Sequence, residues 1–354
     1  MWYIDASLER AGYKEGILKL DTESKIKKDG LGRKSSCPVI VSASRATDIP
    51  AFYSDWLISR IKTGYVKWKN PFSGEFTNVS FEKARLFVFW TKNPAPMLDN
   101  LTFFDNNGLS YYFQYTLNDY EHENWESGLP CLEDRIETFI GLSERIGKEK
   151  LIWRFDPIIL SDKLDQDEIL RRIERIGQRL HQHTERLVFS FIDIENYRKV
   201  KQNLCSIPDR LYEIDAQTME YLAKGISQLN AGWGLKIGTC AEKIDLEQYG
   251  IEHNRCIDDR LIIRLFSHDK ELMAYLGYTT NDQTDFLADQ NSEYSYMRIK
   301  DKGQRKACGC IKSKDIGQYN TCPHGCVYCY ANSDQDTALK NWQKANGKDL
   351  DTIV

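Results

Sequence analysis

The run KLIWRFD at residues 150–156 is almost continuously apolar, and the amphipathic segment QDEILRRIERIGQRL follows it at residues 166–180. A nearly unbroken apolar run of this length is typical of a parallel strand that is covered on both faces. The second segment has apolar residues at helical spacing, and Asp165 stands directly before it as a suitable N-cap. The two segments therefore predict one strand–helix unit.

The same unit recurs along the chain. Helical patterns, one of them preceded by Asp48 as an N-cap, alternate with five further apolar, β-rich runs. These runs are PVIVSAS (38–44), RLFVFWT (85–91), SYYFQYT (110–116), RLVFSFI (186–192) and GLKIGTC (234–240). Alternating strands and helices with short connections predict a parallel sheet, either a barrel or an open doubly wound sheet. No Gly-rich phosphate loop follows a strand, which counts against an NTPase or a dinucleotide enzyme.

Polar and ionisable residues follow the end of every predicted strand, and this favours the barrel. In barrel enzymes the carboxyl ends of the strands converge on one mouth, where the site is built. Exposed loops are polar in any case, so one strand decides little, but six in succession favour a shared site. The candidates for substrate binding or catalysis are Arg45, Asp48, Arg154 and Asp156. Alternatively, Arg45 or Arg154 forms only a structural ion pair with Asp156.

The composition limits the classes of protein. The chain has 354 residues, with 48 Lys and Arg against 52 Asp and Glu, and a net charge of −4. This balance argues against a broad electrostatic grip on duplex DNA but allows a local basic groove. No apolar run approaches the roughly 18 to 20 residues of a membrane helix, and the start MWYIDASLER lacks a hydrophobic signal core. We expect a cytoplasmic protein with reduced thiols and no membrane contact.

The ten cysteines are unevenly spread, because five of them lie within residues 308–329. Three of these form the pattern C-x3-C-x2-C in CPHGCVYC, residues 322–329. Three thiolates on one tight loop can each bind one iron of a cubane 4Fe–4S cluster, since soft sulfur ligands select such clusters. Gly325 lets the loop fold closely around it, and His324 lies inside the loop as a further candidate for tuning the cluster or carrying a proton.

This motif resembles the signature of the radical S-adenosylmethionine superfamily. The resemblance implies that Cys322, Cys326 and Cys329 ligate the cluster, and that Tyr328 packs beside the adenine of the cofactor. S-adenosylmethionine would occupy the fourth iron, where one electron cleaves it to a 5′-deoxyadenosyl radical. The wording CPHGCVYCYA is especially similar to the branch of spore photoproduct lyase, a DNA-lesion repair enzyme whose fold is a partial barrel of six βα units.

Two features depart from that superfamily. Its motif follows the first strand, whereas here the motif follows the sixth predicted strand. Its glycine-rich contact to S-adenosylmethionine after the second strand is replaced here by WTKNP, residues 90–94. Lys92 and Asn93 in this segment, together with Glu242 after the sixth predicted strand, are candidates for binding the cofactor or the substrate.

Residues 38 to 333 are also similar to a bacterial family known as domain of unknown function 1848. The matching segments include SASRATDIPAFYSDW, VFWTKNPAPML, ERIGKEKLIWRFDPIIL, TCAEKIDLEQYGI and QRKACGC. This resemblance implies a barrel with a C-terminal iron–sulfur motif, and it assigns no reaction.

Four further cysteines fall within these segments: Cys240, Cys256, Cys308 and Cys310. Together they could ligate a second cluster or a structural zinc. Alternatively, Cys308 or Cys310 is the fourth ligand of the first cluster, or none of the four binds metal. The remaining three, Cys37, Cys131 and Cys205, are expected only to pack.

These features predict an α/β fold, specifically a partial TIM-like (β/α)6 barrel with a C-terminal iron–sulfur cluster-binding tail. The expected parts are an N-terminal extension (1–36), the barrel (37–267), a polar connection (268–303) and the tail (304–354). The expected function is that of a radical S-adenosylmethionine enzyme, with a nucleic acid or nucleobase as the leading substrate and a flavodoxin- or ferredoxin-type reductant. The alternative is an electron-transfer or other non-catalytic protein whose cluster is ligated entirely by the chain.

Overall fold

The computed structural model describes residues 27–28, 34–195, 197–205, 207–278 and 299–354. Most of the expected N-terminal extension (1–36) and of the polar connection (268–303) lies outside the described residues.

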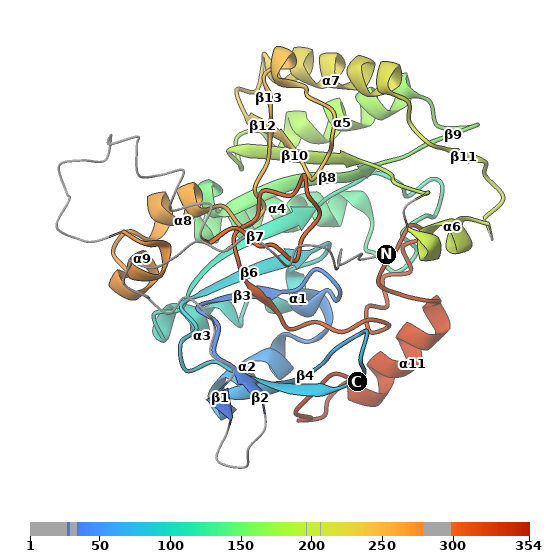
Figure 1. The fold of residues 1–354 in the computed structure, drawn as a ribbon. Coiled ribbons are helices and arrows are strands. Elements are labelled where there is room, and N and C mark those ends of the chain that lie inside the picture. Colours follow the sequence, from blue (N-terminus) through green and yellow to red (C-terminus); the bar gives the residue numbers. More distant parts are fainter. Residues whose placement is uncertain (1–26, 29–33, 196, 206, 279–298) are drawn as a thin grey trace, which may run out of the picture.

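A parallel sheet of eight strands, counted over the described residues, forms the centre of the molecule (Figure 1). Its strands pair in the order β14-β3-β6-β7-β8-β10-β12-β13, and each pairing is parallel. They are β3 (Ile40–Ala43), β6 (Leu86–Thr91), β7 (Ser110–Thr116), β8 (Leu151–Ile158), β10 (Arg186–Phe191), β12 (Lys236–Thr239), β13 (Ile251–His253) and β14 (Lys314–Asp315). The six predicted strands are confirmed, and β13 and β14 are additions to the six that we expected.

Spatial order follows chain order from β3 to β13, without the reversal of a doubly wound sheet. Because parallel crossovers are right-handed, connections that always advance in one direction place their helices on one face. The sheet is therefore compatible with a partial barrel. The helices are α1 (Ile49–Phe52), α2 (Ser54–Thr63), α3 (Leu101–Asn106), α4 (Leu132–Ile146), α5 (Gln166–Leu180), α6 (Arg198–Leu204), α7 (Ala216–Asn230), α8 (Asp259–Phe266), α9 (Lys270–Leu276) and α11 (Gln335–Ala345).

Shorter elements complete the fold. A second sheet pairs in the order β1-β2-β5-β4, and β9 pairs with β11. The bounds are β1 (Lys27–Lys28), β2 (Lys34–Ser36), β4 (Tyr65–Lys69), β5 (Phe76–Ser80), β9 (Leu160–Ser161), β11 (Leu211–Tyr212), and the single 3-10 turns Ala95–Met97, Lys148–Lys150 and Glu247–Tyr249.

Both faces of the main sheet are apolar, which explains why its strands read as continuous hydrophobic runs. On one face, side chains such as Phe87, Phe113 and Trp153 pack against α1 to α5 and α7. On the other face, side chains such as Val88 and Tyr112 pack against α8 and α9, which lie together at one side of the molecule (Figure 1).

The predicted N-caps are confirmed. Asp48 accepts a hydrogen bond from Ala51 N (3.0 Å) at the start of α1, and Asp165 accepts one from Glu168 N (2.8 Å) at the start of α5. These caps fix where the chain leaves β3 and where it enters α5.

The C-terminal part of the chain returns to the edge of the sheet. There β14 pairs in parallel with β3, with Lys314 opposite Val41 and Asp315 opposite Ser42. Asp315 also accepts hydrogen bonds from Ser42 Oγ and from Arg45 N, both at 2.9 Å. The residues after β14 therefore begin at the carboxyl end of β3. Of the helices that the structure describes, none has the length and apolar character that a membrane span requires.

Candidate functional site

A cavity of about 340 Å³ opens at the carboxyl ends of the strands. Its wall takes residues from six successive strands and from the C-terminal tail, as the convergence of parallel strand ends requires. The strand-end residues in the wall include Arg45, Asp48, Lys92, Thr116, Arg154, Asp156, Ser190 and Cys240. The charged residues predicted at strand ends thus largely share one cavity.

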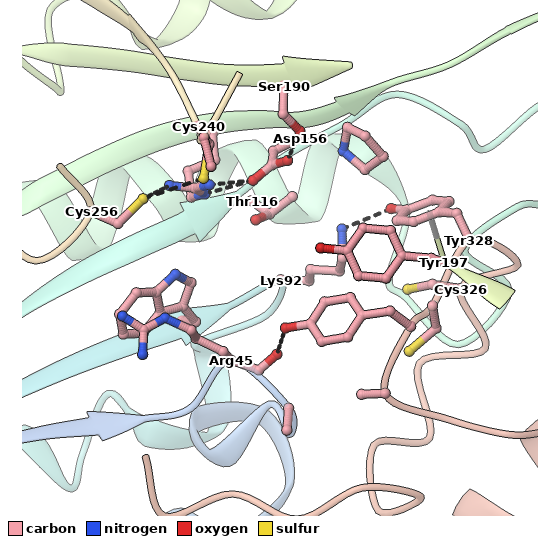
Figure 2. A pocket seen from close by; sticks show the side chains of 18 of the residues that line it. Arg45, Lys92, Thr116, Asp156, Ser190, Tyr197, Cys240, Cys256, Cys326 and Tyr328 are labelled. Atoms are coloured by element: carbon pink, nitrogen blue, oxygen red, sulfur yellow. Dashed lines mark hydrogen bonds and ion pairs between the residues drawn. The ribbon is translucent and has the colours of Figure 1, made fainter. Parts of the chain in front are cut away.

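Seven cysteines line this cavity, and they fall into two sets. The three-cysteine loop (residues 322–329) carries Cys322, Cys326 and Cys329. The four-thiol group consists of Cys240, Cys256, Cys308 and Cys310. In Figure 2, Cys240 and Cys256 lie on one side and Cys326 on the other, with Thr116 and Lys92 between them.

Direct contacts join the members of the four-thiol group. The Sγ atoms of Cys240 and Cys256 are 3.6 Å apart, Ile257 N, next to Cys256, donates to Cys310 Sγ (3.4 Å), and Cys310 and Cys308 are close enough to shift each other's pKa. Cys308 and Cys310 therefore lie with Cys240 and Cys256 rather than beside the three-cysteine loop. This grouping favours a separate second site over a fourth ligand for the first cluster.

A single metal ion needs its ligands to converge on one point. Over the part of the chain that the structure describes, no three His, Cys, Asp or Glu side chains are arranged in that way. The sulfur ligands of a 4Fe–4S cluster bind four different irons and so need a wider spacing. Whether each set of cysteines can bind a cluster therefore depends on its donor atoms and on the residues around it.

The three-cysteine loop packs against the loop that precedes α4. Gly128 N donates to His324 O (2.8 Å) and Val327 N donates to Trp125 O (3.0 Å). Gly325 has φ +69°, and a Cβ built on it would lie 2.5 Å from Ser127 Oγ. A larger residue at position 325 would therefore be strained and would clash with Ser127.

Burial keeps the thiols of this loop protonated. Burial, with a smaller effect of Asp48, raises the pKa of Cys322 to about 12, and burial likewise raises the pKa values of Cys326 and Cys329. A metal centre bound here must displace these protons, so its binding depends on pH.

His324 is held by Asp48, and both are buried. The Nε2 atom of His324 lies 2.7 Å from Oδ2 of Asp48, which also accepts a hydrogen bond from Lys92 N (2.7 Å). Among the described residues, nothing forms a hydrogen bond with Nδ1 of His324, although this atom is buried and His324 lines the cavity. Asp48 thus positions the loop, and the second ring nitrogen of His324 is left for another partner.

Lys92 and Tyr328 meet at a carboxylate that the sequence analysis missed. Lys92 Nζ donates to Glu126 Oε1 (2.7 Å) and to Tyr328 Oη (2.9 Å), and Tyr328 Oη donates to the same carboxylate. Burial alone would raise the pKa of Glu126. The positive charges of Lys92 and Arg135 act in the opposite direction, and the net shift is downward. Nothing in the polar loop EHENWE (121–126) distinguishes Glu126 from its neighbours.

Arg154 joins Asp156 to the four-thiol group. Its Nη1 donates to Cys256 Sγ (3.0 Å) and its Nε donates to Asp156 Oδ2 (3.0 Å), while Ser190 Oγ donates to the other carboxylate oxygen of Asp156. Burial alone would raise the pKa of Asp156. Arg154 acts in the opposite direction, and the net shift is downward. The ion pair considered from the sequence is therefore present, and it also reaches a thiol.

Arg45 lies with its guanidinium 4.6 Å from the centre of the Trp90 ring. Burial alone would lower the pKa of Arg45. The nearby Cys310 and Asp315 act in the opposite direction, and the net shift is upward. Its Nη2 atom is buried and has no hydrogen-bond partner within the described ranges. This cation faces the four-thiol group.

Two of the expected cofactor-binding residues are not in the described wall of the cavity. Asn93 Oδ1 accepts a hydrogen bond from Ala95 N (3.3 Å) and so shapes the turn after β6. Glu242 accepts one from Phe191 N (3.0 Å), and burial raises its pKa to about 7. Both stabilise loops beside the site.

An aromatic and cationic rim also escaped the sequence analysis. The rings of Tyr197 and Tyr330 are 5.8 Å apart, and the guanidinium of Arg305 lies 6.0 Å from the Tyr197 ring. Tyr330 Oη donates to Arg45 O (2.6 Å). These residues come from three separate segments, so no local pattern reveals that they meet.

Comparison with known families gives one extensive match. A family model described as a domain of unknown function (DUF1848) matches residues 40–331, which include the sheet and both sets of cysteines. No functionally curated protein matches the chain. Solved structures that match include the crystal structure of a provisionally assigned alpha-L-fucosidase from Bacteroides thetaiotaomicron, which is 12% identical. That match covers 62% of this chain and 84% of the other, with a TM-score of 0.25.

Proposed function

The chain belongs to the DUF1848 family, and we propose that it is an iron–sulfur enzyme of the radical S-adenosylmethionine type. One observation carries the proposal. The three cysteines of the three-cysteine loop line the cavity, while Cys310 lies beside Cys256, which contacts Cys240. A cluster held by three thiolates would thus present its fourth iron to the cavity.

The residues around the loop fit such a cluster. Three sulfur donors are the ligands that iron–sulfur clusters prefer. Asn332 holds both ends of the motif, because its N–H donates to Cys329 Sγ (3.4 Å) and its Nδ2 donates to Cys322 O (2.7 Å). The buried and unpartnered Nδ1 of His324, on the same loop, is suited to a hydrogen bond with a bound group.

A three-cysteine cluster with S-adenosylmethionine supplies, when bound, a one-electron cleavage of the cofactor to a 5′-deoxyadenosyl radical. The chain itself provides the environment. Lys92 and Arg45 place positive charge in the cavity wall, where they can bind the carboxylate of the cofactor or an anionic substrate. Hydrogen bonds from Lys92 and to Glu126 hold Tyr328 in position in the same wall.

The topology accounts for the unusual position of the motif. In spatial order β14 precedes β3, so the motif at residues 322–329 follows the first strand of the sheet rather than the sixth (Figure 1). Counted from β14, the sixth strand is β10. We infer a partial (β/α)6 barrel whose chain order is circularly permuted, with β12 and β13 as additions, which supports the relationship to this superfamily.

The substrate and partners follow as further parts of the proposal. Tyr197, Tyr330 and Arg305 at the rim offer stacking surfaces and positive charge, which suit a nucleobase or a nucleic acid. The electron would come from a flavodoxin- or ferredoxin-type reductant. Because seven thiols share the cavity, a reducing compartment such as the cytoplasm suits the protein.

The test is the formation of 5′-deoxyadenosine. The full chain is reconstituted anaerobically with iron and sulfide, then incubated with dithionite and S-adenosylmethionine, and the products are separated by chromatography. We expect 5′-deoxyadenosine from the wild type and from Cys131→Ala, whose cysteine is exposed and outside both sets. We expect none from Cys322→Ala. Wild-type protein that holds iron at the loop but forms no 5′-deoxyadenosine would favour the electron-transfer alternative.

A further inference from the structure

We propose that Cys240, Cys256, Cys308 and Cys310 hold a second 4Fe–4S cluster, in which the chain ligates all four irons. This site is separate from the three-cysteine loop and does not depend on the function proposed for that loop.

The four thiols come from distant parts of the sequence and meet at one place. Cys240 follows β12, and Cys256 lies between β13 and α8, whereas Cys308 and Cys310 precede β14. Cys240 Sγ and Cys256 Sγ are 3.6 Å apart, Cys310 Sγ accepts a hydrogen bond from the residue after Cys256, and Cys308 lines the same cavity. Since β13 and β14 are the two edges of the sheet, the group links the segments at its opposite edges.

The backbone around the thiols is already fixed. Cys256 O accepts hydrogen bonds from Tyr112 Oη and Gln114 Nε2, both at 2.8 Å. Ile257 N donates to Cys310 Sγ (3.4 Å), and Ile311 N donates to Ile257 O (3.1 Å). Such contacts hold the backbone of the ligands in place, and only the side chains of Cys240 and Cys256, whose Sγ atoms are 3.6 Å apart, have to separate to bind different irons.

Arginine side chains that are not part of the four-thiol group surround it with positive charge. Arg154 donates to Cys256 Sγ at 3.0 Å, Arg45 lies near Cys310, and Arg305 lies near Cys240. Four thiolates give a cluster a net negative charge, which costs much to bury unless cations and hydrogen bonds compensate. Arg154 supplies both, because it donates directly to a ligand sulfur.

The surroundings favour a cluster over a structural zinc ion. All four of these cysteines line the cavity of about 340 Å³, which offers room beside them for a group larger than one ion. Moreover, the described residues include no three ligands that converge as a single ion requires. A cluster has the size to bridge four sulfurs at the wall of a cavity.

The proposal is tested by counting metal in variants of the full chain. Proteins are reconstituted anaerobically with iron and sulfide, and iron, acid-labile sulfide and zinc are measured. We expect about eight irons in the wild type and in the control Cys131→Ala, and about four, with sulfide, when Cys322, Cys326 and Cys329 are all replaced by Ala. The double variant Cys308→Ala, Cys310→Ala should also retain about four.

Mössbauer spectroscopy of the wild type counts the clusters without any variant, and it decides the matter if a variant does not fold. Loss of all iron from the triple variant, or one zinc ion and no iron in it, would overturn the proposal. So would a wild type with one cluster. Failure of the function proposed above would look different, because both clusters would be present but no 5′-deoxyadenosine would form.

Discussion

The Nε2 atom of His324 lies 2.7 Å from Oδ2 of Asp48, and this contact joins the three-cysteine loop to the carboxyl end of β3. The same carboxylate caps α1 through its other oxygen. One buried side chain therefore supports both the carboxyl end of the sheet and the loop that carries the proposed cluster ligands.

Replacing Asp48 by Ala should lower both the stability of the fold and the amount of iron bound at the three-cysteine loop. Loss of an N-cap costs about 1 kcal/mol, and the unpaired groups of His324 and Lys92 add about 1–3 kcal/mol. The matched control is Asp165→Ala, which removes only the cap of α5. Chemical denaturation should show the larger loss for Asp48→Ala, and iron analysis should show less iron in that variant alone. Equal iron contents in the two variants would contradict the role given to Asp48.

The buried pair of Lys92 and Glu126 should be strongly coupled. Lys92→Met leaves a buried carboxylate without its closest cation, so the free energy of unfolding should fall by about 3–5 kcal/mol. The double variant Lys92→Met, Glu126→Gln should lose much less than the sum of the single variants. The exposed pair of Arg179 and Glu133 serves as a control with a coupling of about 0–1 kcal/mol. Additive losses at Lys92 and Glu126 would argue against the network.

Gly325→Ala tests the close packing of the three-cysteine loop. Gly325 and Gly347 have nearly the same positive φ, +69° and +70°, but only Gly325 has atoms where a Cβ would go. Both substitutions should cost about 1–2 kcal/mol of backbone strain. Only Gly325→Ala should also reduce iron binding and 5′-deoxyadenosine formation. If Gly347→Ala had the same effect on iron binding, strain alone would account for both.

Asp156 should stabilise the protein in a pH-dependent way. Arg154 and Ser190 hold its pKa below the ordinary value of 3.8, so the folded state binds its proton more weakly than the unfolded state. The contribution to stability is therefore complete above about pH 4 and is lost as the pH falls further. Denaturation of the metal-free protein should show a gap between wild type and Asp156→Asn at pH 6 that narrows below pH 4. A gap that is constant over this range would contradict the assignment.

The sequence predicted the parts of the fold that depend on local patterns. Six strands were visible because each is apolar on both faces, and the N-caps Asp48 and Asp165 were visible because capping depends on neighbouring residues. The strand β14 consists of Lys314 and Asp315, and nothing in two polar residues indicates that they pair with β3.

The sequence predicted most residues of the candidate site but not how they are arranged in space. The spacing of Cys322, Cys326 and Cys329 on one loop limits how far apart they can lie. Cys240 and Cys310 are separated by a long stretch of chain, so their presence in one cavity wall depends on the whole topology, and the sequence left three alternatives open. Glu126 was missed for the same reason, since its partners come from β6 and the tail.

The central claim is that the cluster on the three-cysteine loop has a fourth iron open to S-adenosylmethionine. The most direct measurement is the electron paramagnetic resonance spectrum of the dithionite-reduced protein with and without S-adenosylmethionine. The double variant Cys308→Ala, Cys310→Ala is used, so that only this cluster contributes. We predict that the g values shift when S-adenosylmethionine is added. A reduced-cluster spectrum that does not change on this addition would contradict the claim.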